Sequence, residues 1–179
     1  GMLFAGPFVA AKVETLDLFQ DHRVFIDVPE TYTYASARDA RGVITVRITD
    51  PGLKIELLVS FFPDPDGHLA SEDGQRGFVA DASQQFADGS VEKSYDFKDL
   101  SPRSGSGMYC IFTDASLVRK LPVPPGDYLK VTSGVKAWSG CFLVFTLLSN
   151  DTTSEQYQAG MKLLRESFEE KAKASGPVI

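Results

Sequence analysis

The chain has 179 residues, of which 43% are hydrophobic and 23% charged, and its formal net charge is −6. Such a length suits one domain with a proper core, and the composition is ordinary for a soluble globular protein. The acidic balance argues against a general nucleic-acid-binding protein, because a surface that follows phosphates needs a clustered excess of Lys and Arg. No run of about 18 apolar residues occurs, so the sequence predicts no membrane span.

The first residues allow two interpretations. Gly1 resembles a scar from tag removal, and residues 2–11 are apolar, rich in small side chains and followed by Lys12. Val9 and Ala11 have the spacing of the −3 and −1 positions of a signal-peptidase site, but a basic region is missing, so this would be only the remnant of a signal peptide. The alternative is an ordinary first strand. We favour the remnant, which predicts a periplasmic or secreted protein rather than a cytoplasmic one.

We therefore divide the chain into an N-terminal segment, residues 1–21, a single domain, residues 22–175, and a tail, residues 176–179. No internal repeat and no low-complexity segment indicates a further division. Within the N-terminal segment, a short helical turn is predicted from the spacing of three apolar residues, Val13, Leu16 and Phe19.

The first part of the domain has the pattern of consecutive strands. Residues 23–28 form an apolar strand that Pro29 ends. Residues 43–49 alternate between apolar and polar side chains, which is typical of a strand with one wet face. The turn Asp50-Pro51-Gly52 follows, in which proline presets the second turn position and glycine accepts a positive φ. Residues 53–62 then return, so a β-hairpin is predicted.

The middle of the chain predicts a helix followed by further strands. Residues 72–87 place apolar side chains on one helical face, namely Phe78, Val79, Ala82 and Phe86. Two strands are predicted for residues 91–98 and 108–113, joined by a connection rich in Ser and Gly. Residues 128–136 form another strand, and residues 137–148 return beside it.

The end of this last strand, residues 141–148, shows almost no polar alternation. A strand with one face in water alternates, whereas a strand that is apolar on both faces is covered on both, so this segment is predicted to be a central strand. A long helix over residues 152–174 is predicted next, because Thr152 and Glu155 have the spacing of a capping box. One face of that helix carries Tyr157, Met161, Leu164 and Phe168.

Runs of strands with few helices indicate an α+β protein with a mainly antiparallel sheet. Because the central strand is expected to be covered on both faces, we predict an α/β/α sandwich in which helices cover both faces of the sheet. The helices at residues 72–87 and 152–174 are the expected covers. The apolar stripe of the second helix could instead bind a partner, although such stripes usually dock on their own sheet.

Two cysteines, Cys110 and Cys141, each lie in a strand-like run. If the two strands are neighbours, a disulfide is geometrically possible, and it would stabilise the fold by roughly 3–4 kcal/mol. The alternative of two reduced, buried thiols is preferred, because cysteine packs well in a core. No CxxC pair or nearby histidine supplies further metal ligands to either cysteine.

No motif in the sequence is typical of nucleophilic or nucleotide chemistry. Ser104-Gly105-Ser106-Gly107 lies between two predicted strands and lacks the G-x-S-x-G spacing of a nucleophile elbow. A hydrolase would depend on His22 or His68 as its base, and neither lies near a motif. No phosphate-binding glycine motif occurs. An enzyme is therefore the less favoured interpretation, and no catalytic residue is assigned.

An acidic loop is the best candidate for a metal site in the sequence. Carboxylates clustered on a loop bind hard cations such as Ca²⁺ or Mn²⁺. The spacing begins like an EF-hand loop and then fails, because the glycine comes too early. The alternative is a solvated turn whose acids favour the N-terminus of the next helix. The five candidate ligands are Asp64, Asp66, His68, Glu72 and Asp73.

Three segments carry a resemblance to a known family: residues 25–30, residues 143–149, and residues 153–155 at the start of the last helix. Together with the order of the predicted elements, they resemble the PsbP-like superfamily of PsbP and Mog-type proteins, over residues 22–172. This resemblance implies an α/β/α fold with a central antiparallel sheet, and a binding or assembly module rather than an enzyme. It transfers no functional residue to this chain.

The missing catalytic set and the predicted sheet favour a non-enzymatic, exported bacterial domain that binds a protein or a small ligand. One alternative is a divalent-cation-binding module that uses the acidic loop at residues 64–73. A second alternative is a small hydrolase with His22 or His68 beside a serine and a carboxylate.

Overall fold

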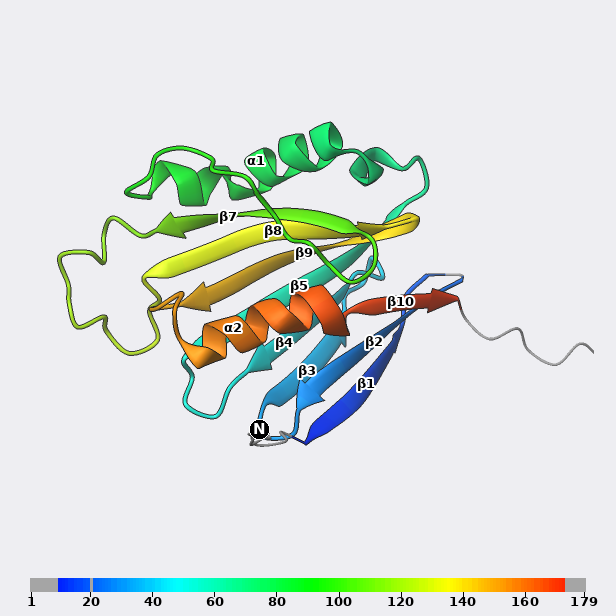
Figure 1. Ribbon diagram of the computed structural model, residues 1–179, viewed down its shortest axis with the longest axis horizontal. Coiled ribbons are helices and arrows are strands. Elements are labelled where there is room, and N and C mark those ends of the chain that lie inside the picture. Colours follow the sequence, from blue (N-terminus) through cyan, green and yellow to red (C-terminus); the bar gives the residue numbers. More distant parts are fainter. Residues whose placement is uncertain (1–9, 20, 173–179) are drawn as a thin grey trace, which may run out of the picture.

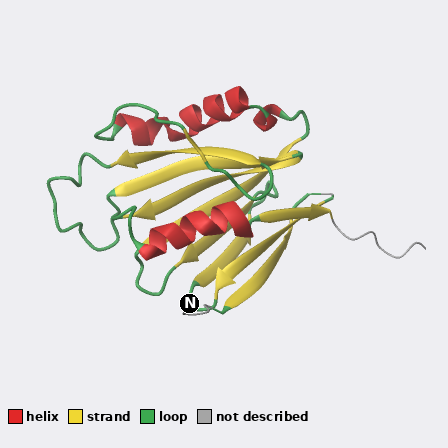
Figure 2. Ribbon diagram, in the orientation of Figure 1, coloured by secondary structure: helices red, strands yellow, loops and turns green. Residues whose placement is uncertain are grey.

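The structure, a computed structural model, describes residues 10–19 and 21–172. It is a mostly β protein, in which 44% of the described residues lie in strands and 20% in helices. Two antiparallel sheets and two α-helices, α1 and α2, form the described part of the chain (Figures 1 and 2). The expected signal-peptide remnant at residues 2–11 lies almost entirely outside the described residues.

The larger sheet has seven strands in the order β3-β4-β5-β9-β8-β7-β6, and every neighbouring pair is antiparallel. The middle strand is β9, which confirms the central position predicted from its apolar run. The sheet ends at β3 on one edge and at the short β6 on the other. Its strands are β3 (Thr33–Arg38), β4 (Ile44–Thr49), β5 (Ile55–Asp64), β6 (Lys98–Asp99), β7 (Ser106–Thr113), β8 (Lys130–Trp138) and β9 (Gly140–Ser149).

The smaller sheet has three strands in the order β1-β2-β10. These are β1 (Ala11–Asp17), β2 (His22–Pro29) and β10 (Glu169–Ala172). The helical turn predicted around Leu16 is therefore wrong, because β1 pairs with β2 along its whole length, from Ala11 opposite Pro29 to Asp17 opposite Arg23. A continuous ladder of backbone hydrogen bonds outweighs a three-residue apolar spacing. The ladder also crosses the boundary that the sequence placed at residue 22.

The first helix, α1 (Glu72–Asp88), confirms the helix predicted over residues 72–87. The Ser71 hydroxyl caps it by accepting a hydrogen bond from the backbone N–H of Gly74 at 3.0 Å. The helix packs against β7 and β8, with Val79 buried at the contact. Ala82, predicted on the buried face, is exposed.

The second helix, α2 (Glu155–Lys162), begins and ends at other residues than predicted. Its N-cap is Ser154, whose hydroxyl accepts from the N–H of Tyr157 at 3.1 Å, rather than Thr152. The helix continues as a π-helical turn, η2 (Leu163–Ser167), and β10 follows where the sequence predicted helix to residue 174. The predicted apolar stripe is confirmed as fully buried: Tyr157, Met161, Leu164 and Phe168.

Two hydrophobic clusters lie on opposite faces of the large sheet, and β9 contributes to both. Leu143, Phe145 and Leu147 pack with α2 and with the inward side chains of β2. Phe142 and Val144 pack on the other face, with α1, β7 and β8. The alternation of side chains along one strand therefore serves two cores.

The predicted α/β/α sandwich covered by helices on both faces is wrong, because the protein is mostly β with two antiparallel sheets. One face of the large sheet is covered by the small sheet together with α2. On the opposite face α1 packs on β7 and β8 and reaches β9 through Phe78 against Phe142, and over β4 the side chains of Thr45 and Arg47 are exposed. The end of the helix predicted over residues 152–174 is instead strand β10, which joins the small sheet beside β2.

Within the described residues, neither helix combines the length and the apolar character needed to cross a membrane. The strand predicted over residues 91–98 is reduced to a short pairing of Lys98 and Asp99 with β7. Strands β4 and β5 form the predicted hairpin, and so do β8 and β9.

Candidate functional site

The five predicted ligands of the acidic loop lie in separate local interactions. The buried Asp64 carboxylate accepts hydrogen bonds from the backbone N–H groups of His68 at 2.9 Å and Leu69 at 3.0 Å, and so fixes the turn before α1. The side chains of Asp66 and His68 are each 80% exposed, with a nitrogen–oxygen distance of 3.9 Å. Asp64 is therefore committed to the loop backbone rather than to a cation.

The remaining two acids belong to the first turn of α1. Glu72 forms an ion pair with Arg76 at 2.9 Å across one helical turn, and Asp73 is exposed. Both carboxylates lie where the helix dipole favours negative charge. Among the described residues, the acidic loop does not form a group of three converging ligand atoms. Calcium or manganese binding there stays a prediction that this geometry does not favour.

The disulfide predicted as possible between Cys110 and Cys141 is not formed, and both thiols are free and buried. Cys110 lies on β7 and Cys141 on β9, with β8 between them. The two side chains also belong to different hydrophobic clusters, on opposite faces of the sheet. Both thiols are buried in a core, as the alternative of two reduced thiols expects.

The serines of the Ser- and Gly-rich connection before β7 have partners other than histidine. The Ser104 hydroxyl donates to a Glu169 carboxylate oxygen and accepts from the indole N–H of Trp138 at 3.2 Å. The Ser106 hydroxyl is hydrogen-bonded by the side-chain amide of Gln75 at 2.7 Å. The serine–histidine pair that a hydrolase requires is therefore not assembled in the described residues.

Three side chains that the sequence did not group together do converge: His22, Cys141 and Glu170. The Nδ1 of His22 lies 2.5 Å from Oε1 of Glu170, and the ligand atoms of the three residues all lie within 4.8 Å of one another. Within the described part of the chain, this is the group of three His, Cys, Asp or Glu side chains whose ligand atoms lie close enough together that they could hold a metal ion. We call these three residues the β10 centre.

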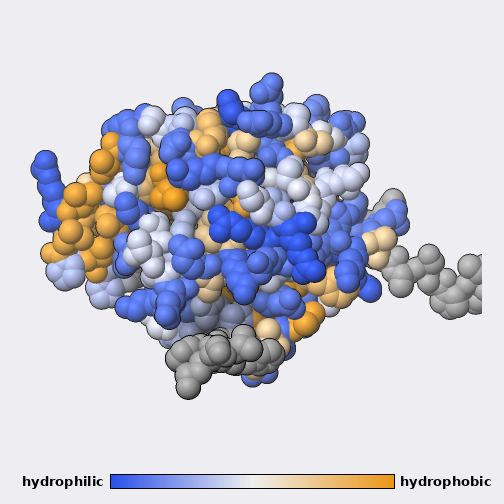
Figure 3. All heavy atoms as spheres, in the orientation of Figure 1, coloured by the Kyte–Doolittle hydropathy of each residue, from blue (hydrophilic) through white to orange (hydrophobic). Residues whose placement is uncertain are grey.

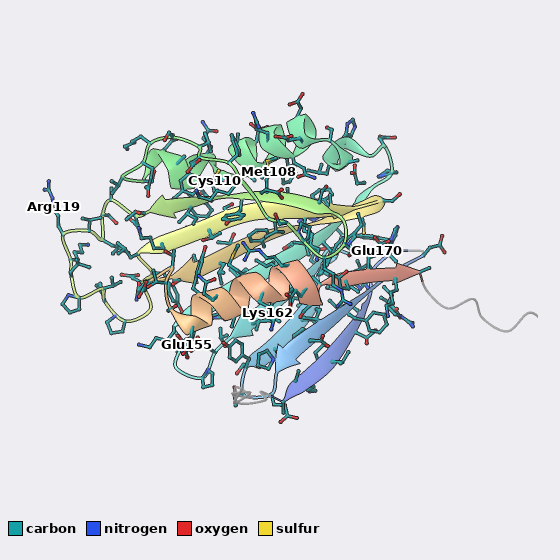
Figure 4. All side chains as sticks on the ribbon, viewed as in Figure 1. Met108, Cys110, Arg119, Glu155, Lys162 and Glu170 are labelled. Carbon is teal, nitrogen blue, oxygen red and sulfur yellow. The ribbon has the colours of Figure 1, made fainter. Side chains whose placement is uncertain are left out.

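The two sheets bring the β10 centre together. His22 begins β2, Cys141 lies at the start of β9, and Glu170 comes from β10, which pairs with β2 so that Glu170 lies opposite Val24. Figure 4 shows Glu170 at the end of the molecule opposite to Arg119. The centre therefore joins three strands that are far apart in the sequence.

Gly140, at the turn between β8 and β9, makes the approach of His22 possible. Its φ is +91°, a conformation that side chains with a Cβ rarely adopt. A Cβ at this position would lie 3.0 Å from Nε2 of His22. The missing side chain therefore leaves space for the imidazole against the hairpin.

Burial controls the chemistry of the thiol in the β10 centre. Cys141 is fully buried, and burial raises the pKa of its thiol to about 12, helped by the negative charges of Glu170 and Asp64. A thiol with such a pKa stays protonated at neutral pH and is a poor nucleophile. The side chains of His22 and Glu170 are 20% and 17% exposed, so the centre meets solvent on their side only.

A second polar network lies next to the β10 centre and shares strand β10 with it, through Glu169. Lys136 of β8 is fully buried, and its ammonium donates to the backbone carbonyls of Leu164 at 2.9 Å and Phe168 at 2.8 Å. It lies 3.6 Å from Oε1 of Glu169 and 5.1 Å from the ring centroid of Trp138. Burial lowers the pKa of Lys136 to about 8, against the opposing effect of Glu169. This network joins the end of η2 to the large sheet.

Neither network faces a cavity large enough for an organic substrate among those described here. Two surface cavities have volumes of about 580 and 550 Å³, and neither is lined by His22, Cys141 or Ser104. The first lies between α2 and the small sheet, and the second between the β4–β5 turn and the loop before β8. A small ion is therefore a better occupant of the β10 centre than a molecule.

Sequence reasoning missed the β10 centre because no local spacing marks it. His22 and Glu170 are separated by 148 positions, and Cys141 lies in an apolar run. The pairing of β2 with β10 is the signal that unites them, and the sequence pattern of residues 169–172 does not specify that partner.

Comparison of the chain with protein-family models, with curated proteins and with solved structures finds no match. The resemblance to the PsbP-like superfamily therefore stays a prediction.

Proposed function

We propose that this protein is a non-enzymatic binding module that holds one borderline transition-metal ion, of the Zn²⁺ class, at the β10 centre. The observation that carries the proposal is the convergence of one imidazole nitrogen, one sulfur and one carboxylate oxygen within 4.8 Å. These donors come from both sheets, so a bound ion would crosslink β2, β9 and β10.

The donor set selects the class of metal. Thiolate and imidazole ligands suit Zn²⁺ and similar ions, whereas Ca²⁺ and Mg²⁺ prefer oxygen ligands alone. The thiol of Cys141 must lose its proton to coordinate, and a nearby dication supplies the charge that stabilises the thiolate. Metal binding is therefore expected to release a proton, and the affinity is expected to rise with pH.

The geometry requires a small adjustment on binding. His22 and Glu170 are hydrogen-bonded at 2.5 Å, and an ion between them would replace that bond with two coordinate bonds of about 2.0–2.2 Å. Both side chains are partly exposed, which gives them room to separate. Three protein ligands leave a fourth tetrahedral position, which water fills from the solvent side.

Titration with CoCl₂ and ZnCl₂ tests the proposal. The wild-type protein is expected to bind one equivalent of Co²⁺ and to develop a sulfur-to-cobalt charge-transfer band that Zn²⁺ displaces. Cys141→Ser is expected to abolish that band, and His22→Gln to weaken binding by about 10-fold or more. Cys110→Ser and His68→Gln are the matched controls, because they remove the other thiol and the other imidazole and leave the β10 centre intact. No binding by the wild type at millimolar metal, or an unchanged band in Cys141→Ser, would overturn the proposal.

A pair of glycine variants gives a second measurement that leaves the ligands in place. Gly140→Ala places a methyl group 3.0 Å from Nε2 of His22, whereas Gly126 has a similar φ of +87° and no atom within 4 Å of the added carbon. Both variants carry the strain of a positive φ. Only Gly140→Ala is expected to weaken Co²⁺ binding, and equal affinities in the two variants would argue against His22 as a ligand.

A further inference from the structure

Exposed apolar side chains gather at the end of the molecule opposite to the β10 centre. The loop between β7 and β8, residues 114–129, exposes 40% of Val118 and 64% of Leu121. The adjacent β4–β5 turn exposes 65% of Leu53, whose backbone carbonyl accepts a hydrogen bond from the Tyr128 hydroxyl at 3.3 Å. Figure 3 shows a hydrophobic patch at this end, over the loop that carries Arg119 in Figure 4.

The loop is held in place rather than free. Leu117 is buried, and the N–H of Lys120 donates to its carbonyl at 2.9 Å. Three prolines follow at positions 122, 124 and 125, which restrict the backbone before any partner binds. Little conformational entropy is therefore left to lose when the tip contacts another surface.

Positive charge lies between the exposed apolar side chains. Arg119 and Lys120 separate Val118 from Leu121, and both are exposed. Among the described residues, neither forms an ion pair. Residues 118–125 carry these two basic side chains and no acidic one, although the whole loop 114–129 also contains Asp114 and Asp127. Within the loop, the positive charge is therefore concentrated beside the exposed apolar side chains of Val118 and Leu121.

We propose that residues 118–125, which we call the docking tip, insert into the interface of an anionic phospholipid bilayer. Aliphatic side chains enter the boundary between headgroups and acyl chains, while Arg and Lys beside them contact anionic headgroups. The tip projects from the body of the molecule (Figure 1), so it can reach a flat bilayer before the rest of the molecule contacts it. The few apolar side chains make this contact reversible and dependent on lipid charge.

Vesicle flotation tests the docking tip directly. The wild-type protein is expected to float with vesicles that contain phosphatidylglycerol, to stay unbound with phosphatidylcholine alone, and to dissociate as salt is raised. The double variant Arg119→Glu with Lys120→Glu is expected to lower the bound fraction about tenfold or more. Leu121→Asp is expected to lower it similarly.

Val91→Asp is the matched control, because Val91 is 58% exposed and lies outside the tip. It is expected to bind as the wild type does. Absence of wild-type binding at low salt, or equal losses in Leu121→Asp and Val91→Asp, would overturn the proposal. Self-association that Leu121→Asp abolishes, without any vesicle binding, would assign the patch to a second copy and overturn it as well. Cys141→Ser is expected to bind vesicles normally, so failure of the metal site and failure of the tip are distinguishable.

Discussion

Lys136 is the residue whose environment departs most from what its type prefers. It is fully buried, yet its ammonium satisfies two carbonyls at the end of η2 and lies beside Glu169. A charged group in an apolar setting is tolerated only when it is paired and hydrogen-bonded. The sequence pattern of β8 places residue 136 in a strand. The two carbonyls that accept hydrogen bonds from its ammonium, however, belong to residues 28 and 32 positions further along the chain. Local sequence could not predict this role.

The lowered pKa of Lys136 gives the folding stability a defined pH dependence. Below about pH 8 the lysine is charged in the folded and the unfolded chain alike. Between about pH 8 and its ordinary value of 10.5, the unfolded chain still holds the proton that the folded chain has lost. Stability therefore rises with pH across this window, by at most about 3 kcal/mol from this group.

We expect Lys136→Met to remove that rise, although it also lowers stability at every pH, because Glu169 loses its cation and the carbonyls of Leu164 and Phe168 lose their donor. Urea unfolding at several pH values measures the effect as the difference in slope between the variant and the wild type. The comparison is needed because the cysteine thiols, with raised pKa values, lower stability in the same alkaline range. Lys162→Met, at an exposed lysine of α2, is the control and should keep the wild-type slope. Parallel slopes for wild type and Lys136→Met would refute this assignment.

At the scale of elements, the sequence predicted which segments are apolar better than where they end. The stripe from Tyr157 to Phe168 is buried as predicted, but the chain leaves the helix after Ser167 and forms β10. Strand β10 has the sequence Glu-Glu-Lys-Ala, and these residue types are at least as common in helices as in strands. Only the distant pairing with β2 decides between the two conformations, so the boundary could not be read from local sequence.

The start of α2 provides a direct test of the capping assignment. Ser154→Ala is expected to destabilise the protein by about 1 kcal/mol, because the N–H of Tyr157 loses its acceptor. Thr152→Ala, at the cap that the sequence pattern favoured, is expected to change stability by less than about 0.5 kcal/mol. Chemical denaturation of both variants measures these values. The reverse order of effects would mean that the helix begins at Thr152 in solution.

The whole molecule is a mostly β protein with two sheets. The sequence did not predict this, because one face of the large sheet is covered by the small sheet as well as by α2. The apolar run of β9 correctly predicted a strand covered on both faces, since that property is local to the run. The nature of the cover is not local: β1, β2 and β10 meet from both ends of the chain. An expectation built on helices alone therefore placed the layers incorrectly.

A metal at the β10 centre would act on the whole molecule. Because it joins β2 and β10 of one sheet to β9 of the other, it should stabilise only the folded state. Zn²⁺ at 100 times its Kd is expected to add about 2.7 kcal/mol, which corresponds to a rise in Tm of about 5–10 °C at this size. Scanning calorimetry with ZnCl₂ and with a chelator measures the shift. At the same Zn²⁺ concentration His22→Gln, with an affinity at least tenfold lower, should show at most about half of that shift. An equal shift in this variant would indicate binding elsewhere.

The edge strand β3 of the large sheet has a consequence for solubility. An edge strand has one side without a neighbouring strand, where its backbone N–H and C=O groups can pair with another chain. Such pairing is a common route to aggregation. Apart from Tyr34, which packs against the core, the side chains of β3 are short or polar, and Arg38 at its end donates to the carbonyls of Gly42 and Asp17. The Arg38 guanidinium thereby links β3, the edge strand of the large sheet, to β1, the outer strand of the small sheet. The charged Arg38 side chain at this edge therefore hinders the addition of a strand from another protein molecule.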